Sequence, residues 1–263
     1  MNDGIIGLQD WFESPAGQYL LAWEQQQFEQ AVADIFGYHA LQLGLPALAS
    51  LQANRMPHRW LATSHDTVVA QGAGRVDLRL DYAALPFPEA SLDLVTLPHA
   101  LDSHPNPHGT LREVARVLVP GGRVVLSGFN PVSLWGLRQE RERLCRRFNI
   151  GTALLPQQLD FIGSRRLRDW LHLLDLEIET GAYGCYRPLL GSEKWLRRWR
   201  WMDRVGTRSW PFFGAVYFMV AVKRVYGVRL LEPVWKRVNG KAAATVPLVR
   251  RHNHGPTIKE NSE

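Results

Sequence analysis

The sequence predicts an α/β fold built around a mostly parallel sheet of seven strands. Short apolar runs of strand length alternate along the chain with segments whose apolar residues recur at helical spacing. The run from Leu92 to Leu97 is apolar almost throughout, which is typical of a strand that is buried on both faces of a sheet. A chain of 263 residues is long enough to form one large domain of this kind.

An amphipathic helix is expected near the N-terminus, from about residue 15 to residue 35. Ser14 is a preferred N-cap residue, and Pro15 suits the first helical position, where its missing N–H is not needed. The apolar residues that follow recur at mostly helical spacing: Tyr19, Leu20, Trp23, Phe28, Val32 and Ile35. We therefore separate an N-terminal helical segment, residues 1–35, from a domain that begins at residue 36.

Seven later segments are expected as strands: His39–Leu45, Arg59–Thr63, Val76–Leu80, Leu92–Leu97, Arg123–Ser127, Leu176–Thr180 and Ala215–Lys223. A helix expected over Thr110–Leu118 ends at the Pro-Gly-Gly turn that starts at Pro120, which we interpret as architectural. Ser164 is expected to cap a further helix that reaches about Leu174. Strands that alternate with helices form right-handed crossovers, and these make the connected strands parallel.

The composition excludes several classes of protein. Apolar residues make up 46% of the chain and charged residues 21%, as in folded globular proteins and unlike disordered chains. Two cysteines, Cys145 and Cys185, exclude a disulfide framework or a Cys-based zinc cluster and fit a reducing compartment. The first ten residues lack the features of a secretory signal, and the longest strongly apolar run, Pro211–Val222, is too short to span a bilayer. We therefore expect a cytoplasmic protein.

Positive charge is concentrated toward the C-terminus. The formal net charge is +6, but residues 194–263 alone carry a net charge of +11, and the preceding residues carry −5. This asymmetry is typical of a protein with a basic surface for an anionic partner. After Asn239 the chain has few large apolar groups, so we expect a disordered basic tail over residues 239–263 and a folded domain over residues 36–238.

The densest sequence signal runs from Asp77 to Trp135. It contains D-Y-A-A-L-P-F-P-E-A-S-L-D-L-V-T-L-P-H-A-L-D-S-H and then L-R-E-V-A-R-V-L-V-P-G-G-R-V-V-L-S-G-F-N-P. This stretch resembles the class I S-adenosylmethionine-dependent methyltransferases, most closely those that methylate small molecules and quinone precursors. The resemblance covers roughly residues 34–223, and the opening F-G-Y-H-A-L-Q-L-G at Phe36–Gly44 resembles an uncharacterised bacterial group of this family.

The resemblance implies a Rossmann-like sheet with an N-terminal helix and C-terminal insertions. It also implies S-adenosylmethionine as the cofactor and methyl transfer to a small or lipophilic acceptor. In open parallel sheets, ligands bind where the strands end, and Asp81 lies at such an end. By resemblance, Asp81 accepts a hydrogen bond from the adenine amino group and Tyr82 covers the adenine. The alternative is that Asp81 caps a loop.

His99 follows the strand Leu92–Leu97, whose end faces the reacting methyl group in related enzymes. Its imidazole titrates near neutral pH, so we expect His99 at the cofactor as a general base. The alternative is a histidine that is hydrogen-bonded for structural reasons. The spacing of His99 with Asp102, His104 and His108 matches no metal-site template, and we expect no metal.

The loop after the first strand departs from the family pattern of an acid followed by three alternating glycines. Gly44 is expected to admit the cofactor, but Gln42 replaces the acid, and Pro46 and Leu48 replace the other glycines. The acid that holds the ribose is represented only by Asp66. Two functions therefore remain open, which are an active methyltransferase with a remodelled loop and a pseudoenzyme with a binding or regulatory role.

A run of aromatic and basic residues, K-W-L-R-R-W-R-W-M-D-R-V, extends from Lys194 to Val205. On a single helix, Trp195, Trp199, Met202 and Val205 would share one face and arginines would lie opposite. Arg-rich helices with tryptophans often rest in the interface of an anionic membrane, here the inner membrane face. The alternative is a helix that packs over the sheet with its polar face in water.

Nucleic acid is a disfavoured partner. The run Arg138–Arg147 alternates basic residues with Glu140 and Glu142, which is typical of a solvated helix with local ion pairs. No known nucleic-acid-binding module is recognisable. A small-molecule substrate is the expected partner, and the sequence indicates no oligomeric state.

Overall fold

The computed structural model describes residues 11–65, 76–146, 159–189 and 193–224. All of them lie in the first of two units into which the chain divides, residues 1–225. The tail expected over residues 239–263 lies outside the described residues. No helix in the described part of the chain is both long enough and apolar enough to cross a membrane.

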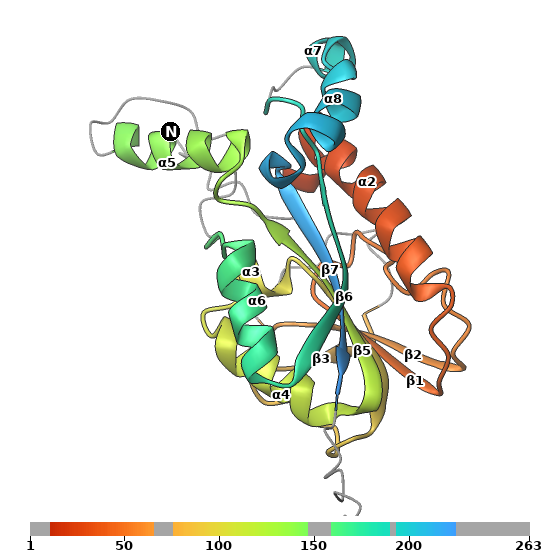
Figure 1. Cartoon of the computed structure of the whole chain (residues 1–263). Coiled ribbons are helices and arrows are strands. Elements are labelled where there is room, and N and C mark those ends of the chain that lie inside the picture. The colour runs from red at the N-terminus through yellow and green to blue at the C-terminus, as the bar shows by residue number, and fades with distance from the viewer. Residues whose placement is uncertain (1–10, 66–75, 147–158, 190–192, 225–263) are drawn as a thin grey trace, which may run out of the picture. The chain divides into compact units, whose positions relative to one another are not determined.

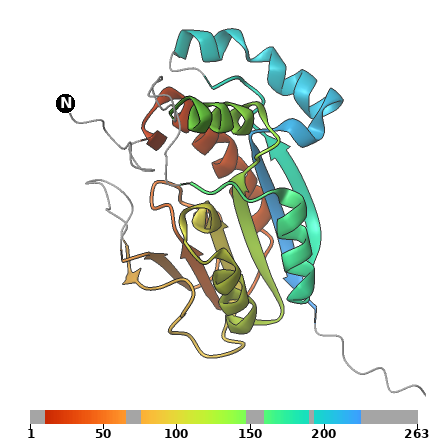
Figure 2. The same ribbon diagram turned by 90° about the vertical axis from the view of Figure 1, so that its left-hand side faces the viewer.

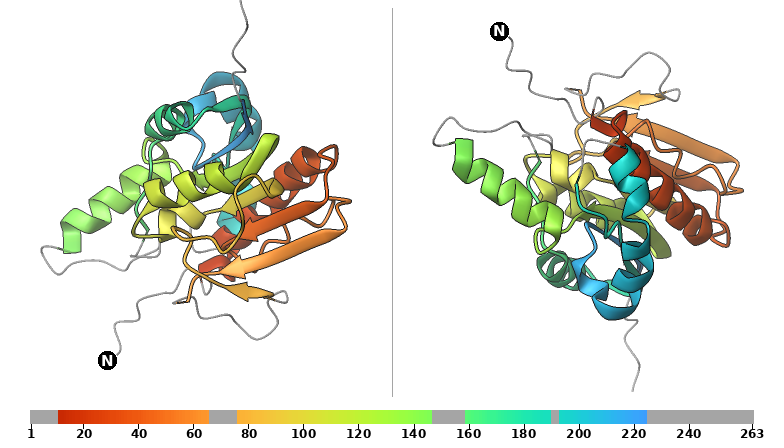
Figure 3. Two further views of the ribbon diagram at one scale, coloured as in Figure 1. Left: turned by 90° about the horizontal axis from the view of Figure 1, so that it is seen from below. Right: turned by 90° about the horizontal axis from the view of Figure 1, so that it is seen from above.

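The sheet has seven strands in the order β3-β2-β1-β4-β5-β7-β6, and Figure 3 shows the red to orange strands β1 to β3 side by side at one end of it. Their bounds are His39–Leu43 (β1), His58–Thr63 (β2), Leu78–Arg79 (β3), Leu92–Pro98 (β4), Leu118–Phe129 (β5), Leu176–Gly184 (β6) and Val216–Lys223 (β7). The strands β1 to β5 pair in parallel, whereas β7 is antiparallel to both of its neighbours, β5 and β6. The prediction of a mostly parallel seven-strand sheet is confirmed.

Helices cover both faces of the sheet. The helices α4 (Pro107–Val117) and α6 (Ser164–Leu173) lie on one face, and α2 (Pro15–Val32) lies on the other (Figure 1). Figure 2 looks onto the face that α4 and α6 cover. Two apolar cores result because the side chains of β4 and β5 alternate between the faces: Val95 and Val124 join the α4 and α6 core, and Leu94 and Val125 join the α2 core.

The helix α2 begins where the sequence predicts. The Ser14 hydroxyl accepts a hydrogen bond from the Gly17 N–H at 3.1 Å, and Pro15 occupies the first turn. Position 17 needs glycine, because a Cβ there would lie 2.4 Å from the carbonyl oxygen of Trp11. The helix ends at Val32, three residues before the expected end at Ile35, which is nevertheless buried.

The Pro-Gly-Gly sequence lies inside β5 rather than directly after a helix. The helix α4 ends at Val117 and the chain enters β5 at Leu118. Between the pairs Leu92–Leu118 and Leu94–Arg123 the register shifts, so four residues of β5 bulge opposite a single residue of β4. Gly121 adopts a φ of +81° there, which explains the glycine. The Pro-Gly-Gly sequence therefore shapes the backbone of a bulge in β5, and it does not form the turn that ends the helix.

The charge run over Arg138–Arg147 falls largely in α5 (Leu134–Arg146), and the Arg138–Glu142 ion pair at 3.1 Å agrees with a solvated helix. The prediction of one continuous helix over Lys194–Val205 is wrong. The chain forms α7 (Glu193–Arg198) and α8 (Trp201–Ser209), separated by a turn, and then the short 3₁₀ helix η1 (Pro211–Phe213). The break lets Leu196 of α7 and Gly206 of α8 both face the interior.

Asp203 attaches α8 to the rest of the unit. Its carboxylate accepts a hydrogen bond from the Tyr19 hydroxyl at 2.5 Å and one from the Arg187 Nε at 2.9 Å. The Arg187 guanidinium also lies 4.2 Å from the centre of the Tyr19 ring. Gly206 packs against Tyr186 so closely that a Cβ would lie 2.3 Å from the ring. The position of α8 is thus fixed by charge and by close packing.

Replacing Asp203 with Asn should lower the free energy of unfolding by about 2 kcal/mol, because hydrogen bonds to a charged group are lost and Arg187 keeps its charge without a partner. Urea unfolding at pH 7 measures the change. Glu193→Gln is the matched control, since its pair with Arg197 spans 4.0 Å in solvent and should contribute nothing measurable. Equal stability of the two variants would contradict the anchoring role.

Candidate active site

The predicted site residues lie at one edge of the sheet. Because β1 to β4 are parallel, their carboxyl ends meet at the same edge, where ligands of open α/β sheets bind. Gly44 follows β1, Asp81 and Tyr82 follow β3, and His99 follows β4. Asp66, the expected ribose ligand, lies outside the described residues. The structure therefore brings four predicted residues to the expected edge, and their surroundings differ greatly.

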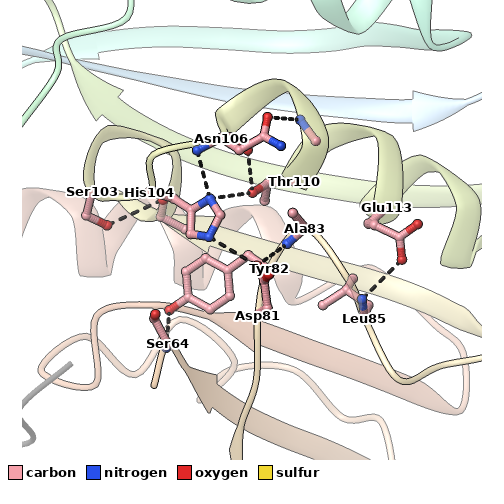
Figure 4. A network of polar contacts seen from close by, with 12 residues as sticks. Ser64, Asp81, Tyr82, Ala83, Leu85, Ser103, His104, Asn106, Thr110 and Glu113 are labelled. Carbon is pink, nitrogen blue, oxygen red and sulfur yellow. Dashed lines mark hydrogen bonds and ion pairs between the residues drawn. The ribbon is translucent and has the colours of Figure 1, made fainter. Parts of the chain in front are cut away.

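The carboxylate of Asp81 caps the loop after β3 and is still accessible to solvent. Its Oδ1 accepts a hydrogen bond from the Ala83 N–H at 2.8 Å and lies 3.2 Å from the His104 Nε2 (Figure 4). The side chain is 58% exposed, so it can accept a further hydrogen bond. Capping and ligand binding, the two interpretations of Asp81, are thus compatible. The role of Asp81 toward adenine stays a prediction.

His104 orients Asp81, a role that the sequence did not reveal. The Asn106 N–H donates a hydrogen bond to the His104 Nδ1 at 3.2 Å, so in the neutral ring the proton lies on Nε2, which faces Asp81. The imidazole is held in addition against the ring of Tyr82, with 5.3 Å between ring centres. His104 therefore supplies a donor to one carboxylate oxygen and restricts the rotation of the side chain.

Tyr82 is a fixed wall of this edge. It is only 2% exposed, and its hydroxyl oxygen accepts a hydrogen bond from the Ser64 N–H at 3.0 Å (Figure 4). Burial raises the pKa of Tyr82 to about 12. The contact ties the end of β2 to the segment after β3, so Tyr82 is a rigid, buried part of this edge. Whether it covers adenine stays a prediction.

The loop after β1 is closed by Gln42, the residue that replaces the family acid. The Gln42 amide nitrogen donates hydrogen bonds to the carbonyl oxygens of Leu48 at 2.6 Å and Leu45 at 3.1 Å. Its amide oxygen accepts from the N–H and the hydroxyl of Ser50, at 3.1 and 2.8 Å. A carboxylate could not donate to these carbonyl groups, so glutamine suits a loop that is tied to its own strand.

Gly44 is required for the close approach of this loop to the end of β4. It adopts a φ of +88°, and a Cβ would lie 3.2 Å from the Ala100 Cβ and 3.3 Å from the Pro98 carbonyl oxygen. Leu45 and Leu48 are buried in the core beneath α2. These contacts explain the glycine without a ligand, and the expectation that Gly44 admits the cofactor stays a prediction.

His99 lies in the interior, between two carboxylates. Its Nδ1 is 3.0 Å from the Asp102 Oδ2, its Nε2 is 2.9 Å from the Glu24 Oε1, and the residue is 1% exposed. Burial disfavours a charged ring, but the charge of Glu24 and the hydrogen bond to Asp102 outweigh it and raise the pKa of His99 to about 10. Asp102 also accepts a hydrogen bond from the Phe129 N–H at 3.0 Å.

This arrangement gives His99 a structural role in the state described. Both ring nitrogens face carboxylates, and the ring packs against Phe129, with 4.3 Å between ring centres. The general-base role stays a prediction. The two histidines that follow in the sequence lie elsewhere, because His104 faces Asp81 and His108 of α4 packs against Trp170.

Glu24 is the functional-site neighbour that the sequence analysis missed. It is fully buried on α2, between Leu20 and Phe28 in a stripe of residues spaced by four. A lone acid in such an apolar stripe is a detectable signal, because buried carboxylates need partners. The partner itself, 75 positions later in the sequence, has no local signature.

The described residues fit the adenosyl end of S-adenosylmethionine, the cofactor that the family resemblance implies. Asp81 offers an exposed acceptor that His104 orients, whereas the ring of Tyr82 is buried beside it and packs against His104. At the other end, Pro46 lacks an N–H, and the N–H groups of Leu48 and Ser50 already donate within the loop. The fit therefore rests on the end of β3.

Replacing Glu24 with Gln should lower the free energy of unfolding by roughly 3 kcal/mol at pH 6, because His99 loses a buried charged partner. In the parent protein the pKa of His99 is about 10 when folded and ordinarily 6.5, so only the folded state keeps this proton as the pH rises between them. Stability should therefore fall from about pH 6.5 to pH 10, and this fall should flatten in the variant.

Urea unfolding at pH 6, 8 and 10 measures both effects. Glu89→Gln, at an exposed position, is the matched control and should retain the parental pH dependence. Parallel pH profiles for the parent protein and the Glu24→Gln variant would contradict the assigned pairing.

Comparison with known proteins identifies the family. A family model described as a methyltransferase domain matches residues 56–126. The chain is similar to the uncharacterised protein YafS of Escherichia coli (strain K12), with 32% identity over 177 residues, 66% of this chain and 67% of the relative. It is also similar to an uncharacterised chloroplastic methyltransferase of Arabidopsis thaliana, with 35% identity over 75 residues, 27% of this chain and 21% of the relative.

Solved structures share the fold. A S-adenosylmethionine-dependent methyltransferase from Thermotoga maritima has a TM-score of 0.54 and 13% identity over 78% of this chain and 92% of its own. Another from Archaeoglobus fulgidus has a TM-score of 0.52 and 14% identity over 77% of this chain and 94% of its own. The chain belongs to the class I S-adenosylmethionine-dependent methyltransferases, enzymes that take the methyl group from this cofactor.

Proposed function

We propose that the protein transfers the methyl group of S-adenosylmethionine to a lipophilic acceptor. The observation that carries the proposal is an apolar cavity of about 280 Å³. Its walls include Leu134 of α5, Tyr186 after β6, Trp201 and Val205 of α8, and Trp210 and Phe213 before β7. Cavities lined by aromatic and aliphatic side chains bind the hydrocarbon parts of small molecules.

Strand pairing supports a place for this cavity at the same edge of the sheet as Asp81. Phe129 at the end of β5 pairs with Val216 at the start of β7, and Val216 pairs with Gly184 at the end of β6. The segments that line the cavity follow β5, follow β6 or precede β7, so all of them emerge at the carboxyl edge. Cofactor and acceptor would approach from different ends of one edge.

The role proposed for the residues of this chain is to position the cofactor and the acceptor. The bound cofactor supplies a methyl group on a sulfonium sulfur, which is already electrophilic. The carboxylate of Asp81, oriented by His104, would hold the adenosyl end, and the apolar wall would orient the acceptor and exclude water. The Tyr186 hydroxyl donates to the Pro211 carbonyl oxygen at 2.9 Å, so this wall presents its ring.

The alternative of a regulatory protein without methyl transfer receives no support from the family match or the relatives. The remodelled loop, in which Gln42 replaces the family acid, satisfies its polar groups within the loop, so the proposal places no cofactor contact there.

Calorimetric titration with S-adenosylmethionine tests the cofactor half. Asp81→Asn should weaken binding about tenfold, a loss of about 1.4 kcal/mol, because the amide can offer its acceptor only in one orientation. His104→Ala should weaken it less, and His104→Gln, which retains a donor, should restore part of the loss. Asp34→Asn at an exposed position is the control. Unchanged affinity in the Asp81→Asn and His104→Ala variants would show that Asp81 does not hold the cofactor.

Transfer of tritiated methyl groups to a bacterial lipid extract, compared with an aqueous extract, tests the acceptor half. Label should enter the organic phase, and Val205→Trp should lower its incorporation at least tenfold because indole fills the cavity. Ser209→Trp, at an exposed position of the same helix, is the matched control. Label confined to aqueous products, or equal activity of both variants, would contradict a lipophilic acceptor.

A further inference from the structure

We propose that the surface formed by α7, α8 and η1 docks onto an anionic lipid bilayer. We call this surface the aromatic face, and its five large aromatic side chains are between 51 and 67% exposed: Trp195, Trp201, Trp210, Phe212 and Phe213. Apolar groups of this size are seldom left together in water by a folded protein, and a cluster of them marks an interaction site. The proposal concerns where the protein acts and does not depend on the identity of the acceptor.

The exposure of the aromatic face is held in place by the rest of the unit. Asp203 anchors α8 to Tyr19 and Arg187 from the side opposite the solvent. The Asn130 side-chain amide donates to the carbonyl oxygens of Phe212 at 2.8 Å and Gly214 at 2.9 Å, which fixes η1 to the end of β5. A segment fastened at both ends presents its aromatic side chains outward as a stable surface.

The aromatic face is continuous with α5 through the walls of the apolar cavity. Trp201, Trp210 and Phe213 belong both to the aromatic face and to the cavity, and Leu134 of α5 completes the wall. Leu134 is itself 50% exposed. The cavity therefore lies among the side chains of the aromatic face, so a molecule dissolved in an apposed bilayer could enter it with little passage through water.

The charge of this surface selects an anionic partner. Arg200, Arg204 and Arg208 are exposed, and among the described residues none of the three has an acidic partner. The acids of the same segment do not compensate, because Asp203 is bound to Tyr19 and Arg187, and Glu193 lies 4.0 Å from Arg197. Exposed aromatic rings among arginines match the lipid interface, where rings sit at headgroup depth and guanidinium groups meet phosphates.

Co-sedimentation of the full chain with large vesicles tests the proposal. The vesicles are phosphatidylcholine alone or a mixture with about one third phosphatidylglycerol, and we expect at least tenfold stronger binding to the mixture. Arg200→Gln, Arg204→Gln and Arg208→Gln together should weaken that binding by roughly fivefold per arginine. Trp195→Ser with Phe212→Ser should weaken binding at least tenfold to the same vesicles.

The controls keep docking separate from catalysis and from the charge of the tail. Arg112→Gln, Arg165→Gln and Arg168→Gln together remove the same charge from α4 and α6, and Leu173→Ser removes an exposed apolar group from α6. All of these should bind vesicles as the parent protein does. Trp195 and Phe212 are not among the residues that line the cavity, so their loss should leave S-adenosylmethionine binding unchanged.

Three outcomes would overturn the proposal. The first is equal binding to both kinds of vesicle. The second is vesicle binding that is unchanged in the aromatic-face variants but is abolished when residues 226–263 are removed. The third is absence of vesicle binding together with a dimer, seen by light scattering, that the Trp195→Ser and Phe212→Ser variant dissociates. That result would assign the aromatic face to a second copy of the chain. If the protein methylated lipid but did not bind vesicles, the proposed function would hold and the docking proposal would fail.

Discussion

The geometry of the site edge depends on one buried imidazole held between two carboxylates. Glu24 comes from α2, His99 from the end of β4, and Asp102 from the short helix α3 (Ala100–Ser103). Asp102 in turn accepts the Phe129 N–H of β5. Charges removed from water are costly unless an opposite charge lies close by, so few arrangements of these elements bring the three groups together. The ion cluster thereby fixes how α2 meets the end of β4, and the same contacts hold His99 away from solvent.

The loop after β1 shows how a family site can lose glycines and keep its fold. Glycines in such a loop leave room for a ligand, whereas here leucine side chains turn into the core and Gln42 gathers the freed carbonyl groups. At the end of β3, by contrast, the Asp81 carboxylate is exposed, and the Nε2 of His104 faces it.

Features set by neighbouring residues could be predicted, and features set by distant partners could not. The strand at Leu92 and the helix start at Ser14 follow from burial pattern and capping, which are local. The role of His99 depends on Glu24, and the orientation of α8 depends on Tyr19, which is 184 positions from Asp203. The single helix expected over Lys194–Val205 failed for this reason, since periodicity does not report a turn that lets Leu196 and Gly206 both face inward.

The position of the aromatic face is a consequence of strand direction. Because β7 is antiparallel to β5 and β6, it must begin at the edge where they end. Any segment inserted between β6 and β7 therefore leaves from and returns to the carboxyl edge, whatever its sequence. An insertion rich in tryptophan and arginine at this point adds an apolar wall and a basic rim to an edge whose other end carries Asp81. The topology thus lets the segment between β6 and β7 change in such a protein while the other end of the edge keeps its frame.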